Sequence, residues 1–170
     1  MTGSAHGFDE FVAARWTRLV RSAVLLGADV HAAEDVVQVA LAKCHRRWTR
    51  VTRADDVDAY VHRVLINTLL DSRRRRWWGE TPTEALPEAG RSVDDVAGAV
   101  AESDAMRGAL LRLPLGQREV VVLRFYADLT EQQTATALGV ALGTIKSRTS
   151  RALAALAADE SLRDVVQEES

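Results

Sequence analysis

Residues 129–155, LTEQQTATALGVALGTIKSRTSRALAA, predict two short helices joined by a tight turn. Thr130 and Gln133 have the spacing of a capping box, in which each side chain accepts a hydrogen bond from the backbone amide of the other residue. Gly139 is expected to end the first helix, because glycine adopts a left-handed backbone without a side-chain clash. The stretch therefore has the pattern of a helix-turn-helix.

The second helix of this pair combines an apolar stripe with many hydroxyl and cationic side chains. The stripe, at helical spacing, consists of Ile145, Thr149, Ala152, Leu153 and Leu156. The other faces carry Thr144, Lys146, Ser147, Arg148, Ser150 and Arg151. Such side chains can reach base edges and phosphates when a helix enters the major groove with its N-terminus first. The alternative is a solvated amphipathic helix without a ligand.

Composition limits the fold class and the compartment. The 170 residues are 47% hydrophobic but only 5% aromatic, with few glycines and prolines, which favours an all-α protein. No apolar run approaches the ~18 residues of a membrane span, and the first residues lack the pattern of a signal peptide. We therefore expect a cytoplasmic protein without membrane insertion.

Cysteine and histidine give no sign of a metal, cofactor or catalytic site. Cys44 is the single cysteine, so no internal disulfide can form, and its place on an apolar helix face predicts a buried side chain. The four histidines have no second ligand at a suitable spacing. The sequence thus predicts no metal, no cofactor and no enzymatic activity.

Charge is segregated along the chain, although the net charge is only −2. Residues 43–76 are rich in arginine, whereas residues 80–104 hold acids and one arginine. The basic segment ends in the run Arg73, Arg74, Arg75 and Arg76. Trp77 and Trp78 follow it, and arginines beside aromatic rings suit the binding of unstacked bases. The two tryptophans can equally pack the end of a helix.

The first half predicts three amphipathic helices, over about residues 8–26, 30–48 and 57–77. Gly27 is expected to end the first helix and Asp29 to cap the second, while acids just before residue 57 cap the third. The third helix has an apolar stripe and, opposite it, a mixed basic face. That face consists of His62, Arg63, Asn67, Leu70 and Arg74.

Residues 79–101 predict a flexible acidic linker, because two of the three prolines and several glycines fall there. Beyond the linker, the sequence predicts one helix from about Glu102 to Pro114 and another over residues 117–126. The expected architecture is therefore all-α, with two small helical domains at residues 1–78 and 102–170.

Three runs of the sequence carry a family resemblance. They are HAAEDVVQVALAKCHRRW at 31–48, DAYVHRVLINTLLDSRRRRWW at 58–78, and RLPLGQREVVVLRFYADLTEQQTATALGVALGTIKSRTSRALAAL at 112–156. Together they resemble extracytoplasmic-function (ECF) sigma factors of the sigma-70 superfamily, most of all the actinobacterial SigE-type branch. The resemblance covers nearly everything except the linker and the two tails.

This resemblance implies a specificity subunit of bacterial RNA polymerase. A sigma-2-like first domain would bind the polymerase clamp and open the −10 promoter element. A sigma-4-like second domain would dock on the flap and read the −35 element as duplex DNA. The linker is then compatible with a nucleic-acid mimic in a polymerase channel or with a plain spacer. An anti-sigma protein is a further partner known for relatives.

Site residues follow from the resemblance, position by position. The clamp-binding residues implied are Glu34, Asp35, Val37 and Gln38. Those implied for the melted −10 strand are Thr52, Arg53, Ala54, Asp55, Arg63, Asn67, Arg73, Arg74, Arg75 and Arg76. Those implied for the −35 element are Thr144, Lys146, Ser147, Arg148, Ser150 and Arg151.

The sequence departs from the family at the start of the recognition helix. Ala141 stands where a capping Ser or Asp is usual, and losing such a cap costs roughly 0.5–2 kcal/mol. Leu142 replaces a neighbour that is commonly polar. Both departures fall at the end of the helix that the resemblance assigns to the DNA contacts.

Two other functional classes account less well for the sequence. A free-standing helix-turn-helix regulator usually dimerises, and the sequence has no coiled-coil heptads or extra dimerisation helix. A metal-dependent nuclease could use Asp55, Asp56 and Asp58, but capping explains acids at a helix start more simply.

Overall fold

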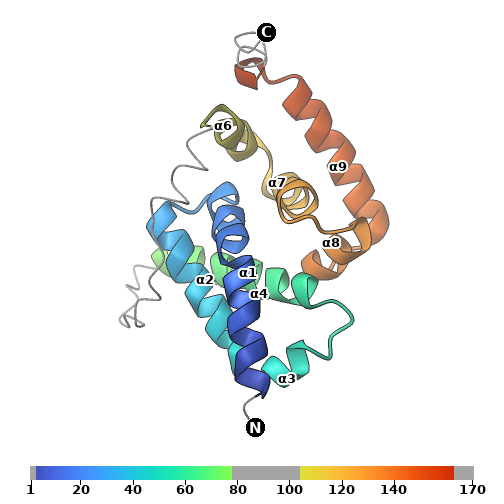
Figure 1. The fold of residues 1–170 in the computed structure, drawn as a ribbon. Coiled ribbons are helices and arrows are strands. Elements are labelled where there is room, and N and C mark those ends of the chain that lie inside the picture. The colour runs from blue at the N-terminus through green and yellow to red at the C-terminus, as the bar shows by residue number, and fades with distance from the viewer. Residues whose placement is uncertain (1–2, 78–103, 163–170) are drawn as a thin grey trace.

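The computed structural model describes residues 3–77 and 104–162, and the side chains of 7–75 and 104–162. In these ranges every regular element is a helix, which confirms the predicted fold class (Figure 1). The first half contains α1 (Gly3–Leu25), α2 (Val30–His45), α3 (Trp48–Val51) and α4 (Val57–Trp77). The second half contains α6 (Asp104–Arg112), α7 (Leu115–Val121), the π-helical turn η1 (Val122–Tyr126), α8 (Glu131–Leu138) and α9 (Leu142–Ala157). The predicted linker, Trp78 and the side chains of Arg76 and Trp77 lie outside what is described.

Local capping chemistry sets the helix boundaries of the first half. The Asp29 carboxylate accepts from the Ala32 amide at 2.9 Å, and Gly27 has a φ of +108° at the end of α1. Helix α2 ends at His45, three residues earlier than predicted. Trp48 is the reason, because it starts α3 and packs its ring against Phe8 and Phe11 instead of extending α2. The apolar faces of α1, α2 and α4 meet in one core, and Cys44 is buried in it as expected.

The helix-turn-helix forms as predicted. Thr130 and Gln133 make both hydrogen bonds of the capping box, and Gly139 adopts the left-handed conformation, with a φ of +66°. Ala141 occupies the N-cap of α9 without any side-chain hydrogen bond. One position of the apolar stripe is wrong: Leu153 is 44% exposed, because it lies about 100° around the helix from the fully buried Ala152.

The two halves pack against each other and share an apolar core. Leu110, Val122 and Ala137 of the second half belong to the same buried cluster as the side chains between α1, α2 and α4. Helix α8 lies beside α4, and η1 lies beside α1 (Figure 1). His62 lies on the predicted mixed basic face of α4, and it is buried because the second half covers that side of the helix.

Among the helices in residues 3–77 and 104–162, none combines the length and the apolar character that crossing a bilayer requires.

Candidate nucleic-acid interfaces

A hollow of about 350 Å³ opens between the end of α2 and the middle of α4. Its lining consists of Lys43, Arg46, Arg47, Tyr60, Val64 and Asn67. All six residues belong to the described part of the chain, and none of them is acidic. The hollow is therefore a cationic site with one aromatic ring and one amide.

The helical register explains why these side chains converge. Tyr60, Val64 and Asn67 are spaced by four and three residues, so they share one face of α4. Of the cations, Lys43 comes from the last turn of α2, where it also complements the helix dipole, and Arg46 and Arg47 come from the two residues that follow the helix. Lys43 is held in place by donating from Nζ to the Thr68 hydroxyl at 3.0 Å.

Only Asn67 of this lining was among the predicted site residues. The other five lining residues were not among the predicted site residues. Sequence reasoning missed the hollow because its two sides lie about 20 residues apart and meet only in the fold.

The loop before α4 contributes no residue to the lining of the hollow. Thr52, Arg53 and Asp55 are exposed and Ala54 is half-buried. The Thr52 hydroxyl donates to the carbonyl of Trp48, the first residue of α3, at 3.1 Å, which fixes the start of the loop to this short helix. The exposed side chains of Arg53 and Asp55 remain accessible to a ligand.

The arginine run does not present one uniform face. Arg63, which precedes the run on α4, is exposed, as are Arg74 and Arg75. Arg73 instead donates from Nη2 to the carbonyl of Leu26 at the end of α1. The run is thus split between solvent and an intramolecular contact.

The predicted recognition helix also divides into accessible and packed residues. Lys146, Ser147, Ser150 and Arg151 are exposed, and Thr144 is half-buried.

Arg148 is half-buried, with its guanidinium against α7. A Cβ built on Gly116 would lie 3.0 Å from its Cζ atom. The same guanidinium acts on Glu119, whose pKa is raised by burial while Arg148 and two other arginines oppose the rise. Arg148 therefore helps to hold α9 on α7.

The predicted clamp-binding residues lie on α2 with different exposures. Asp35 is exposed and Glu34 and Gln38 are half-buried, whereas Val37 is completely buried in the core. In this conformation Val37 supports the helix from inside, and Val39 is the exposed aliphatic side chain of that segment.

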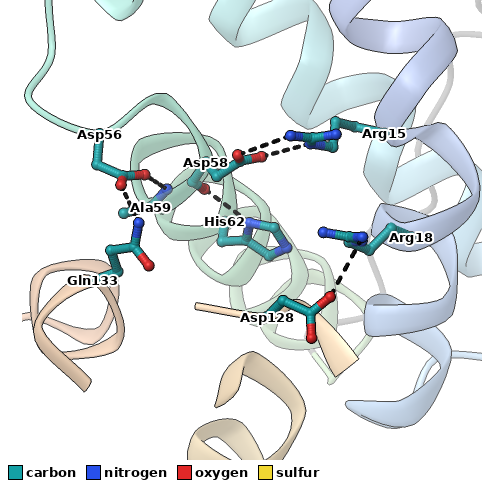
Figure 2. A network of polar contacts seen from close by, with 8 residues as sticks. All are labelled: Arg15, Arg18, Asp56, Asp58, Ala59, His62, Asp128 and Gln133. Carbon is teal, nitrogen blue, oxygen red and sulfur yellow. Dashed lines mark hydrogen bonds and ion pairs between the residues drawn. The ribbon is translucent and has the colours of Figure 1, made fainter. Parts of the chain in front are cut away.

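The acids at the start of α4 serve the fold. Asp56 accepts from the Ala59 amide at 2.7 Å, and Asp58 pairs with Arg15 at 2.9 Å (Figure 2). Their carboxylates point to different partners, so with Asp55 they do not form the convergent set that a nuclease metal site needs.

Two family models match this chain, one in each half of the fold. The sigma-70 region 2 model matches residues 11–79, and the sigma-70 region 4 model matches residues 103–156. The RNA polymerase sigma-E factor of Streptomyces avermitilis is 41% identical over 165 residues, covering 95% of this chain and 91% of the relative. The chain belongs to the sigma-70 family, in its ECF group. The ECF RNA polymerase sigma factor SigM of Mycobacterium tuberculosis is 34% identical, covering 92% of this sigma factor and 79% of its own length.

Solved structures agree with the sigma-factor fold. CnrH, in complex with the cytosolic domain of CnrY, matches with a TM-score of 0.66 and 23% identity, covering 96% of this chain and 92% of CnrH. RpoE of Bartonella quintana, in complex with the anti-sigma factor NepR, matches with a TM-score of 0.72 and 24% identity, covering 92% and 97%. At these identities the likeness concerns the fold, and it confirms the two-part helical architecture.

Proposed function

We propose that this sigma factor binds core RNA polymerase and directs it to promoters through two separate DNA contacts. The observation that carries the proposal is that regions 2 and 4 occur in one chain, each with its own cationic surface. We assign residues 1–78 to clamp binding and the −10 element, 79–101 to a linker and 102–170 to the flap and the −35 element.

The hollow between α2 and α4 is proposed to hold the melted −10 strand. Opening DNA costs on the order of 1.4 kcal/mol per base-pair step in lost stacking. A base stacked on an aromatic side chain returns about 1–3 kcal/mol. Tyr60 can offer such a ring, the cations of α2 can hold phosphates, and Asn67 can bond a base edge. No nucleophile and no cofactor are needed for this role.

Additional strand contacts are proposed around this hollow. They are Thr52, Arg53, Ala54, Asp55, Arg63, Arg73, Arg74, Arg75 and Arg76. The exposure of the loop and of Arg63, Arg74 and Arg75 supports this assignment. Arg73 would first have to leave the Leu26 carbonyl.

The N-terminal part of α9 is proposed to read the −35 duplex in the major groove. Thr144, Lys146, Ser147, Ser150 and Arg151 are the proposed contacts. Arg148 is proposed to act from its place against α7, and a direct contact of Arg148 with DNA stays a prediction.

The exposed side of α2 is proposed to bind the polymerase clamp through Glu34, Asp35 and Gln38, with Val37 supporting them from the core. The compartment proposed is the cytoplasm, where the core polymerase and promoter DNA are found. An anti-sigma factor is a further candidate partner, because the related RpoE was solved with one.

Reconstitution with core RNA polymerase tests the function. Purified chain should co-elute with core polymerase and support run-off transcription from a promoter that core alone does not use. A chain that neither co-elutes nor supports transcription from any mapped promoter of its source would overturn the proposal.

A further inference from the structure

Two hydrogen bonds in series join Lys43 of α2 to the backbone of α4. The Lys43 ammonium donates to the Thr68 hydroxyl at 3.0 Å. That hydroxyl in turn donates to the carbonyl of Val64, one turn earlier on α4, at 2.7 Å. Thr68 is 5% exposed and does not line the hollow, whereas Lys43 and Val64 do. Thr68 can therefore act on a ligand in the hollow through Lys43.

The direction of the Thr68 hydroxyl is set by its bond to its own helix. A hydroxyl group has one proton to donate and two lone pairs that accept. The proton is used on the Val64 carbonyl, so the oxygen is left to accept from the ammonium. A β-branched side chain also has few alternative rotamers on a helix. The acceptor for Lys43 is thus fixed in place before any ligand binds.

A neighbouring cation of the hollow is held differently. Arg46 is exposed, and its Nε atom donates to the carbonyl of Ala42 at 3.4 Å. That bond stays at the end of α2, whereas the bond from Lys43 reaches across to α4. Arg46 therefore offers a matched comparison, because it is a cation of the same lining that does not bond to Thr68.

An ammonium that is already ordered binds a phosphate more readily than a mobile one. Ordering a lysine side chain on binding costs rotamer entropy, and a side chain that is fixed beforehand avoids that cost. An ammonium has three donors, so the bond to Thr68 leaves two for a phosphate. Among the described residues that line the hollow none is acidic, so the charge of Lys43 is not neutralised there.

We propose that Thr68 is a positioning residue of the −10 site, which holds the Lys43 ammonium in the hollow where it binds a phosphate of the melted strand. The inference rests on the proposed function, because that function places the strand in this hollow. Thr68 then contributes to strand binding without touching DNA, and its contribution exists only while Lys43 is present.

A double-mutant cycle on the full chain tests this coupling. Thr68→Val removes the hydroxyl and keeps the shape, and it should weaken binding of a fluorescent single-stranded −10 oligonucleotide from a mapped promoter by about 2-fold to 12-fold. Lys43→Met should weaken binding at least as much. It should also make the slope of log affinity against log salt concentration shallower by about 0.7, whereas Thr68→Val should leave that slope unchanged. In the Lys43→Met chain, Thr68→Val should cause no further loss.

Control variants separate positioning from a general effect on the fold. Thr68→Ser keeps the hydroxyl and should bind nearly as the wild type, while Thr68→Ala lacks it and should lose as much as Thr68→Val. In an Arg46→Met chain, Thr68→Val should cause its full loss, because Arg46 does not bond to Thr68.

Three results would overturn the role of Thr68. They are no loss with Thr68→Val, the same loss with and without Lys43, and a loss with Thr68→Ser as large as that with Thr68→Val. A wild-type chain that binds the oligonucleotide neither alone nor with core polymerase would instead overturn the proposed function.

Discussion

The hollow on the first half and the recognition helix on the second are both cationic, yet they suit different forms of DNA. The hollow is concave and places the Tyr60 ring among cations, which favours bases that have left the stack. The exposed face of α9 is convex and carries short hydroxyls beside cations, which favours an intact major groove. With similar charge on both surfaces, their shape decides which form of DNA each half is suited to bind.

The largest effect is expected from a substitution that removes the Tyr60 ring from the hollow. Tyr60→Ala should weaken binding of a single-stranded −10 oligonucleotide by about 1–3 kcal/mol, which is roughly 5-fold to 150-fold, because stacking is lost. Fluorescence anisotropy measures this, and −35 duplex binding should not change. Tyr60→Phe keeps the ring and should bind nearly as the wild type. Equal losses on both kinds of DNA would break the distinction between the two surfaces.

The next effect concerns the uncapped start of α9. Ala141→Ser should stabilise the chain by about 0.5–2 kcal/mol, because a hydroxyl would accept from a free amide of the first turn. Urea unfolding measures the change. Ala155→Ser, an exposed site inside the same helix, is the control and should not stabilise it. An unchanged midpoint for Ala141→Ser would mean that another group already caps the helix.

A smaller effect separates two arginines of α9. Arg151→Ala should reduce the slope of log affinity for the −35 duplex against log salt concentration by about one, because an exposed cation that is proposed to contact a phosphate is lost. Arg148→Ala should lower stability by about 1 kcal/mol and leave the salt dependence unchanged, because its guanidinium packs on α7. Binding measured from 50 to 300 mM salt distinguishes them. A reduced salt dependence for Arg148→Ala would instead indicate that the Arg148 side chain contacts DNA.

The smallest effect concerns the interface that keeps the two surfaces together. Burial lowers the pKa of His62, opposed by the carbonyl of Asp58. The contribution of neutral His62 to the free energy of unfolding is therefore complete above the ordinary histidine pKa of about 6.5. It is lost as the pH falls below that value. His62→Gln should lose less stability than the wild type between pH 7.5 and 5.5 in urea unfolding. His31→Gln, at an exposed site, should behave as the wild type, and an identical pH dependence of all three would refute the assignment.

Local chemistry made part of this protein predictable. The caps at Asp29 and Thr130, the left-handed Gly139 and the bounds of α4 depend on residues a few positions apart, and all were predicted correctly. The missing cap at Ala141 could be predicted for the same reason.

Contacts between distant segments made the rest unpredictable. Periodicity placed His62 opposite the apolar stripe of α4, but it cannot show that the second half covers that side of the helix. It also cannot show that the end of α2 meets Tyr60, or that Arg148 turns toward Gly116. The family resemblance supplied the roles of these surfaces, and their shapes came from the fold.

The turn η1 has a consequence for how the second half is oriented. Its wide turn is closed by the Ala127 amide donating to the carbonyl of Val122, five residues earlier, at 3.0 Å. Such a turn contains one residue more than an α-helical path, and each residue rotates a helix by about 100°. Deleting a single codon here would therefore swing α8 and α9 by more than a quarter of a revolution, redirecting a whole binding surface while every residue proposed to touch DNA stayed the same.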